Sequence, residues 1–338
     1  MARIAQVSID SLTSALMDRL DPLVPTMLLV DPLLGEPIPE LVEASEICAD
    51  IEDLNDARAS AWRGEVFSVP LDVSIPVRSA LHPYLVELAG LSPDTLGESV
   101  RIAIEERSRA MHKGIAPHRL GGWFQTAQPQ RLVVQLAKLC RLRTQSGAGG
   151  KARYLRIADR RVFGWLRHVV GSAQIDARIP ALQRGFWLDD TGALKQAGGA
   201  GGTSDAPLIV SVAEWGRLSL GDELHPVRAR WLGIDPGASG DYEAVEWALE
   251  QARQTASRWP SRFVTSTDRQ SWALMALLYG DLSPEAGIER LLRHGDPEYP
   301  EAPGQPPEPF HSLFAVACNV VEQNRLPRSK SSMLEQHP

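Results

Sequence analysis

The chain has 338 residues, of which 43% are hydrophobic and 23% are charged, and its formal net charge is −7. These values are typical of a globular protein and exclude a wholly disordered or collagen-like chain. An acidic balance gives no general attraction to nucleic acid or anionic lipid. Because single cores rarely grow beyond about 250–300 residues, the length predicts two lobes.

The cysteines and the N-terminus indicate the compartment. Cys48, Cys140 and Cys318 lie far apart in apolar segments. Their odd number and spacing argue against a disulfide framework and a thiolate metal site. Residues 1–20 lack the apolar core of a signal peptide, and no segment approaches the roughly 18 apolar residues of a membrane span. We therefore expect a soluble, cytoplasmic protein.

The first 190 residues alternate apolar runs of strand length with segments of helical periodicity. Expected strands are 26–30, 65–69, 81–88, 123–126, 152–158 and 185–188. Expected helices are 9–20, 41–50, 93–113, 129–142 and 160–170. This alternation predicts an α/β lobe over residues 1–190, with a mixed sheet and flanking helices.

The pattern changes after residue 190. Residues 191–206 are rich in Gly, Ala, Ser and Thr and are predicted to form a flexible loop. Residues 207–325 are expected to form a smaller, mainly helical lobe, with helices at 243–258, 268–279, 284–293 and 309–323. The polar residues 326–338 are predicted to form a disordered tail.

Motifs of known catalytic and phosphate-binding sites are absent or incomplete in the sequence. It contains neither the Gly-x-Ser-x-Gly turn of serine hydrolases nor a His-Glu-x-x-His pair. Residues 147–152 resemble a phosphate-binding loop, but Gln145 and Ala152 stand where that loop needs Gly and Ser or Thr. The sequence therefore predicts no catalytic residue, no metal site and no cofactor.

A basic stretch stands out in this acidic chain. It holds ten cations and one acid, Asp159; the cations are Arg131, Lys138, Arg141, Arg143, Lys151, Arg153, Arg156, Arg160, Arg161 and Arg167. Such a concentration indicates either ion pairs with acids from other segments or a docking surface for an acidic partner. For the docking surface the candidates are Lys138, Arg141 and Arg143. A nucleic-acid interface is a third interpretation.

Nine tryptophans are many for this length, and Trp occurs both in cores and at interface hot spots. Three of them, Trp123, Trp165 and Trp187, fall in predicted regular elements of the first lobe and are expected in its core. Three others fall in the helical lobe, where either core packing or a partner-binding groove is expected: Trp247, Trp259 and Trp272.

Four short motifs occur in an order and spacing known from one family. They are Met27-Leu28-Leu29-Val30-Asp31, His82-Pro83-Tyr84-Leu85-Val86, Gly122-Trp123-Phe124 and Arg156-Ile157-Ala158-Asp159-Arg160-Arg161-Val162. The last corresponds to an Arg-x-x-Asp-Pro-Arg-Val run in the family, with Arg160 in the place of Pro. Through these motifs residues 26–188 resemble the effector-adaptor chaperones of bacterial type VI secretion.

The resemblance implies a non-enzymatic adaptor without a cofactor, with a trailing helical lobe. Its implied partners are an effector toxin and the spike protein of the valine-glycine repeat family. It marks five signature residues: Asp31, Tyr84, Trp123, Arg156 and Asp159. Asp159 stands where a helix N-cap should be, and Arg156 could reach its carboxylate, so we expect both to be structural. The alternatives are an enzyme of unrecognised class and a nucleic-acid-binding regulator that uses residues 131–167.

Overall fold

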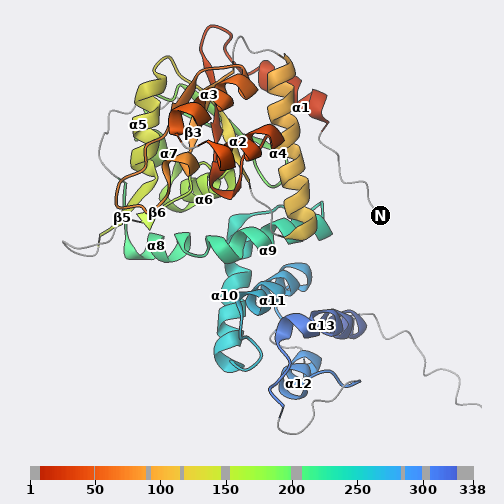
Figure 1. Cartoon of the computed structure of the whole chain (residues 1–338). Helices are drawn as coiled ribbons and strands as arrows, with labels where there is room; N and C mark the ends of the chain where they lie inside the picture. The colour runs from red at the N-terminus through yellow and green to blue at the C-terminus, as the bar shows by residue number, and fades with distance from the viewer. Residues whose placement is uncertain are drawn as a thin grey trace, which may run out of the picture. The chain divides into compact units, whose positions relative to one another are not determined.

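The computed structural model describes residues 8–48, 50–88, 93–114, 118–145, 153–198, 208–282, 286–298 and 305–325. The chain divides into two compact units, Met1–Asp222 and Glu223–Pro338. The first combines a sheet with helices and the second is helical among the described residues, which confirms the predicted fold class (Figure 1). Among the described helices, none has the length and apolarity needed to cross a membrane.

Unit 1 is built around a six-stranded antiparallel sheet. Its strands are β1 (Thr26–Val30), β2 (Val66–Ser68), β3 (Tyr84–Glu87), β4 (Leu120–Gln125), β7 (Arg184–Leu188) and β8 (Leu194–Ala197). They lie in the order β2-β3-β1-β4-β7-β8, and each neighbouring pair is antiparallel. The central strand β1 is buried along its whole length, which explains why its sequence is a continuous apolar run.

Helices cover both faces of this sheet. The helices of unit 1 are α1 (Ile9–Met17), α2 (Pro39–Ile47), α3 (Ile51–Trp62), α4 (Pro93–Lys113), α5 (Pro129–Leu139), α6 (Arg160–Val170), α7 (Ser172–Asp176) and α8 (Val212–Leu218), with short 3-10 turns η1 (Pro32–Leu34) and η2 (Ser79–Leu81). Leu28 lies opposite Trp123, and this face packs on side chains of α1, α3 and α4. On the other face, Phe163 of α6 contacts Phe124 and Trp187 at ring distances of 6.2 and 5.3 Å.

A second, three-stranded sheet contains β5 (Arg141–Thr144), β6 (Arg153–Tyr154) and β9 (Ile209–Val210). β5 pairs antiparallel with β6 and parallel with β9. The helix predicted over 129–142 therefore ends earlier, at Leu139, because the residues from Arg141 onward pair with strands from other parts of the chain.

The boundary between the units also differs from the predicted one. Unit 1 continues past residue 190, because β8 pairs with β7 in a hairpin and β9 pairs with β5. Within the predicted loop over 191–206, Leu194–Ala197 forms β8. Residues 199–207 lie outside the described part of the chain, as does the predicted tail, 326–338.

Unit 2 contains the helices that the sequence predicted and one that it did not. They are α10 (Tyr242–Arg258), α11 (Ser266–Tyr279), α12 (Ala286–His294) and α13 (Phe310–Arg325), preceded by α9 (Gly221–Ile234), which begins at the unit boundary. α11 packs on α10 and α13, and α12 packs on α13. Phe263, Trp272 and Phe310 form an aromatic core, with ring centroids 5.1–5.7 Å apart.

Candidate functional site

Charged residues gather at one edge of the six-stranded sheet. β1 ends at Val30, and its antiparallel neighbours β3 and β4 begin at that same edge. Directly after β1, Asp31 donates its backbone N–H to the carbonyl of Arg119, at 2.7 Å. We call this cluster the ionic corner. It consists of four buried acids, Asp31, Glu36, Glu106 and Asp159, and the arginines that contact them, Arg58, Arg119, Arg156, Arg160 and Arg161.

The carboxylate of Asp31 joins the first strand to the segment before α6. It accepts hydrogen bonds from the backbone N–H of Leu33 and from Arg156 Nε, both at 3.0 Å, and Arg156 Nη2 lies 2.9 Å from it. Burial raises the pKa of Asp31, while the Arg156 guanidinium opposes that shift. Asp31, the last residue of the first motif, is therefore one half of a long-range ion pair.

Asp159 is the N-cap of α6, as the sequence predicted. Its carboxylate accepts a hydrogen bond from the backbone N–H of Arg161 at 3.0 Å, and the Arg161 side chain donates to both of its oxygens, at 3.0 and 2.7 Å. Burial alone would raise the pKa of Asp159, but the positive groups around it, Arg161 foremost, together outweigh burial and hold that pKa far below the usual value.

Arg156 reaches the Asp159 carboxylate, as the sequence suggested, but its closer contacts are to another acid. Its Nη1 forms an ion pair with Asp159 at 3.9 Å, whereas its contacts with Asp31 are at 2.9 and 3.0 Å. The physical reason is that β1 brings the Asp31 carboxylate to the same corner, whereas Arg161 reaches Asp159 directly from the first turn of the helix.

Arg160, which stands in the place of the family's proline, is buried and makes hydrogen bonds to two other elements. Its Nη1 donates to Glu106 Oε2 at 2.7 Å and to the carbonyl of Leu120 at 2.9 Å, and its Nη2 donates to the carbonyl of Ala103 at 2.8 Å. Glu106 also accepts from the backbone N–H of Arg119 at 2.9 Å. Arg160 thus fastens the start of α6 to α4 and β4.

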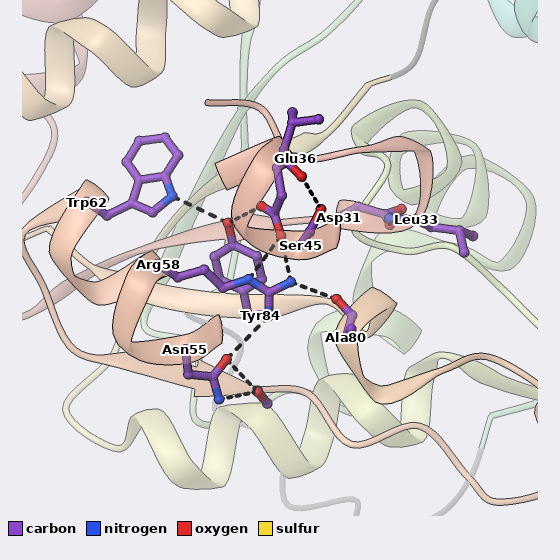
Figure 2. A network of polar contacts seen from close by, with 11 residues as sticks. Asp31, Leu33, Glu36, Ser45, Asn55, Arg58, Trp62, Ala80 and Tyr84 are labelled. Atoms are coloured by element: carbon purple, nitrogen blue, oxygen red, sulfur yellow. Dashed lines mark hydrogen bonds and ion pairs between the residues drawn. The ribbon is translucent and has the colours of Figure 1, made fainter. Parts of the chain in front are cut away.

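Glu36 and Arg58 form the most deeply buried ion pair of the corner, with side chains 1% and 0% exposed. Arg58 Nε and Nη2 donate to Glu36 Oε1 at 3.0 and 2.6 Å, and the guanidinium stacks 4.2 Å from the centre of the Tyr84 ring. The Tyr84 hydroxyl donates to Glu36 Oε2 at 2.8 Å and accepts from the indole N–H of Trp62 at 3.4 Å. Figure 2 shows these groups converging from α3, β3 and the segment after η1.

This burial has a clear effect on Tyr84. Burial and the neighbouring Glu36 charge raise the pKa of the Tyr84 hydroxyl well above its usual value. The hydroxyl therefore stays protonated and serves as a hydrogen-bond donor to the carboxylate. The remaining signature residue, Trp123, is buried on the same sheet and donates its indole N–H to Ser99 of α4 at 2.8 Å.

The arrangement is that of a scaffold. Each carboxylate of the corner is bound by a guanidinium. Arg58, Arg156 and Arg160 lie outside the elements of their acids, whereas Arg161 binds the N-cap of its own helix. Buried pairs of this kind make the loss of one partner costly, so they hold the connected elements in one arrangement. In the part of the chain that the structure describes, no group of three His, Cys, Asp or Glu side chains could hold a metal ion.

The three predicted docking cations lie together on unit 1. Lys138 is exposed in the last turn of α5, and Arg143 is exposed on β5. Arg141 is partly exposed and forms an ion pair with Asp72 at 2.5 Å. Thus part of the predicted surface is neutralised by an acid from another segment.

The three predicted partner-binding tryptophans have different environments in unit 2. Trp247 is 41% exposed on α10, and Trp259 at the end of that helix lies under the guanidinium of Arg293, 6.0 Å from its ring. Trp272 is buried in the aromatic core. Trp272 is therefore a core residue, because its ring packs edge-on against the stacked rings of Phe263 and Phe310.

Sequence reasoning missed Glu36, Arg58 and Glu106. No local signal marks them, because an acid or arginine in a mainly polar helix or turn has the appearance of a solvated surface residue. Comparisons of the chain with protein-family models, curated proteins and solved structures find no significant match.

Proposed function

We propose that this protein is a non-enzymatic cytoplasmic adaptor that binds a type VI secretion effector and loads it onto the spike protein of the valine-glycine repeat family. The observation that carries the proposal is the meeting of two of the resembling motifs. Asp31 and Arg156 lie 125 residues apart in the sequence, yet their charged groups are in direct contact.

This contact supports a real resemblance. Short motifs arise by chance in any long chain, but chance gives no reason for residues of separate motifs to pair in a buried network. Tyr84, from a third motif, binds Glu36 of the same corner. The signature residues thus have a common physical role, which is to hold the sheet, α3 and α6 together.

A scaffold fixed in this way suits a binding protein. The charged groups of the ionic corner pair with one another, so a partner would be recognised by other, exposed side chains. Because these side chains lie on a rigid framework, little entropy is lost on binding. Such an adaptor would cover a segment of the effector and hold it beside the spike protein until the secretion apparatus assembles.

The proposal is tested by deletion in the strain that encodes the chain. We expect the effector encoded beside it to disappear from the culture medium, while secretion of the spike protein continues. Restoring the wild-type chain should restore effector secretion, and purified chain, effector and spike protein should form a ternary complex in size-exclusion chromatography. Normal effector secretion in the deletion strain would contradict the proposal.

A further inference from the structure

Internal ion pairs remove half of the basic stretch from any docking surface. Five of its arginines contact carboxylates, in the pairs Arg141–Asp72, Arg156–Asp31, Arg160–Glu106, Arg161–Asp159 and Arg167–Asp176. Arg131 donates to the side chain of Gln128. The structure thus leaves few cations of the basic stretch as candidates for a docking surface. One of them, Arg153, contacts an aromatic ring.

Arg153 lies on an aromatic ring. It is an exposed residue at the start of β6, and its guanidinium carbon lies 4.7 Å from the centre of the ring of Trp215 in α8. Figure 1 shows β5 and β6 beside α8. Within the described residues Arg153 has no ion pair, and residues 146–152, which precede it, contain no acid.

The acid nearest to Trp215 in the sequence, Glu214, already accepts hydrogen bonds from another residue. Glu214 accepts from the backbone N–H and the hydroxyl of Ser211, both at 2.7 Å, in a capping box that fixes the start of α8. The Arg153 guanidinium therefore makes a cation–π contact with the Trp215 ring. Among the described residues, no carboxylate neutralises its charge.

The exposed side of α8 is apolar around this pair. Val212 is 66% exposed and stands three residues before Trp215, so both lie on one face of the helix. Gly216 is exposed, and the place where a Cβ would stand has open space around it. We call these four residues, Arg153, Val212, Trp215 and Gly216, the Arg153–Trp215 face.

We propose that the Arg153–Trp215 face is a docking surface for a segment of a protein partner that carries a carboxylate beside an apolar side chain. The carboxylate pairs with Arg153, the apolar side chain covers Val212 and the indole ring, and Gly216 lets the partner backbone approach closely. Arg and Trp are the residue types most enriched at interface hot spots. This inference rests on the proposed function as a binding protein and gives it a site.

The same observations favour a protein over nucleic acid. A phosphate could pair with Arg153, but the phosphate group itself offers no apolar surface to Val212, whose exposed methyl groups gain stability only against another apolar surface. The net charge of −7 also opposes the approach of a polyanion. Binding of an oligonucleotide at this face is therefore an outcome that would overturn the proposal.

The test uses the full chain and two synthetic peptides. One alternates Glu and Leu over ten residues, and the other has Gln in place of each Glu. Indole N–H signals of the tryptophans are followed by nuclear magnetic resonance, and the Trp215 signal is identified by its absence in Trp215→Phe, a variant that keeps an aromatic ring under Arg153. We expect the Glu peptide to shift the Trp215 signal and to bind about tenfold more tightly than the Gln peptide.

Two variants test the role of the guanidinium. Arg153→Gln should abolish the preference for the Glu peptide, whereas the control Arg131→Gln, which removes the same charge from an exposed position of the same stretch, should keep it. Equal melting temperatures of both variants and the wild type show that folding is unaffected. Equal affinity for the two peptides, an equal effect of both variants, or tighter binding of a ten-residue oligothymidine would overturn the proposal.

Complex formation with the effector separates this inference from the proposed function. An effector that binds the wild type and Arg153→Gln equally well would overturn the docking surface and leave the adaptor role intact. Peptide selectivity that depends on Arg153, in a chain that forms no complex with effector or spike protein, would support the docking surface and contradict the adaptor role.

Discussion

Removing Arg58 should reveal how strongly the ionic corner holds the fold. In Arg58→Ala the Glu36 carboxylate, 1% exposed, loses its guanidinium and, among the described residues, keeps only the Tyr84 hydroxyl as a close donor. The carbonyl of Ala80 and the side chain of Asn55 lose a donor as well. Breaking a buried pair by removing one partner costs about 3–5 kcal/mol, so we expect a loss of that size in the free energy of unfolding.

Arg101 is a matched control for this experiment. It is paired with the carboxylates of Glu98 and Glu105, but its side chain is 41% exposed on α4. Exposed ion pairs contribute about 0–1 kcal/mol, so Arg101→Ala should have a small effect. Both arginines are thus paired with glutamate, one in the interior and the other at the surface.

The assay is urea unfolding followed by circular dichroism, with hydrogen exchange of the segments of α3 and β3 as a local measurement. We expect Arg58→Ala to lower the urea midpoint and to speed exchange in both segments. A second variant strengthens the test: Arg58→Met combined with Glu36→Leu should be less destabilised than Arg58→Met alone, because no charge is left unpaired. Equal destabilisation by Arg58→Ala and Arg101→Ala would refute this reasoning.

Two further predictions concern α6 and the glycines. Asp159→Asn should lower the free energy of unfolding by about 2–4 kcal/mol at neutral pH, because Arg161 loses its carboxylate. The pKa of Asp159 lies below that of an unfolded aspartate, about 3.9, so its stabilisation is present above that pH and is lost as the pH falls. Urea titrations at several pH values should therefore show that wild type and variant differ less in free energy of unfolding below about pH 4. A difference that does not change with pH would contradict the low pKa of Asp159. Gly64→Ala should disrupt the β2–β3 pairing, because its Cβ would stand 1.7 Å from the carbonyl oxygen of Glu87. Gly97→Ala in α4, where the Cβ meets nothing within 4 Å, should instead raise the free energy of unfolding by about 0.5–1 kcal/mol. Thermal unfolding of both variants checks this contrast. A shift of the two melting temperatures in the same direction would contradict it.

Elements whose signals are local were predicted closely. The buried run of β1, the long periodic helix α4 and the capped helix α6 have the bounds expected from the sequence. The cap at Asp159 was predicted for the same reason, since an N-cap and the backbone it binds are neighbours in the chain. By contrast, α3 was missed, because its sequence is mainly polar and only Leu54, Arg58 and Trp62 are buried.

The sequence by itself determined the α/β character of the first unit, the helical second unit and three residues of the ionic corner, Asp31, Arg156 and Asp159. Tertiary structure decided which charges meet there: Arg156 lies closer to Asp31, 125 residues away in the sequence, than to nearby Asp159. It also decided that Arg141 begins a strand, since β5 exists through its pairing with β6 and β9. Caps and periodicity depend on residues a few positions apart, whereas ion pairs and strand pairing depend on which distant segments the folded chain brings together.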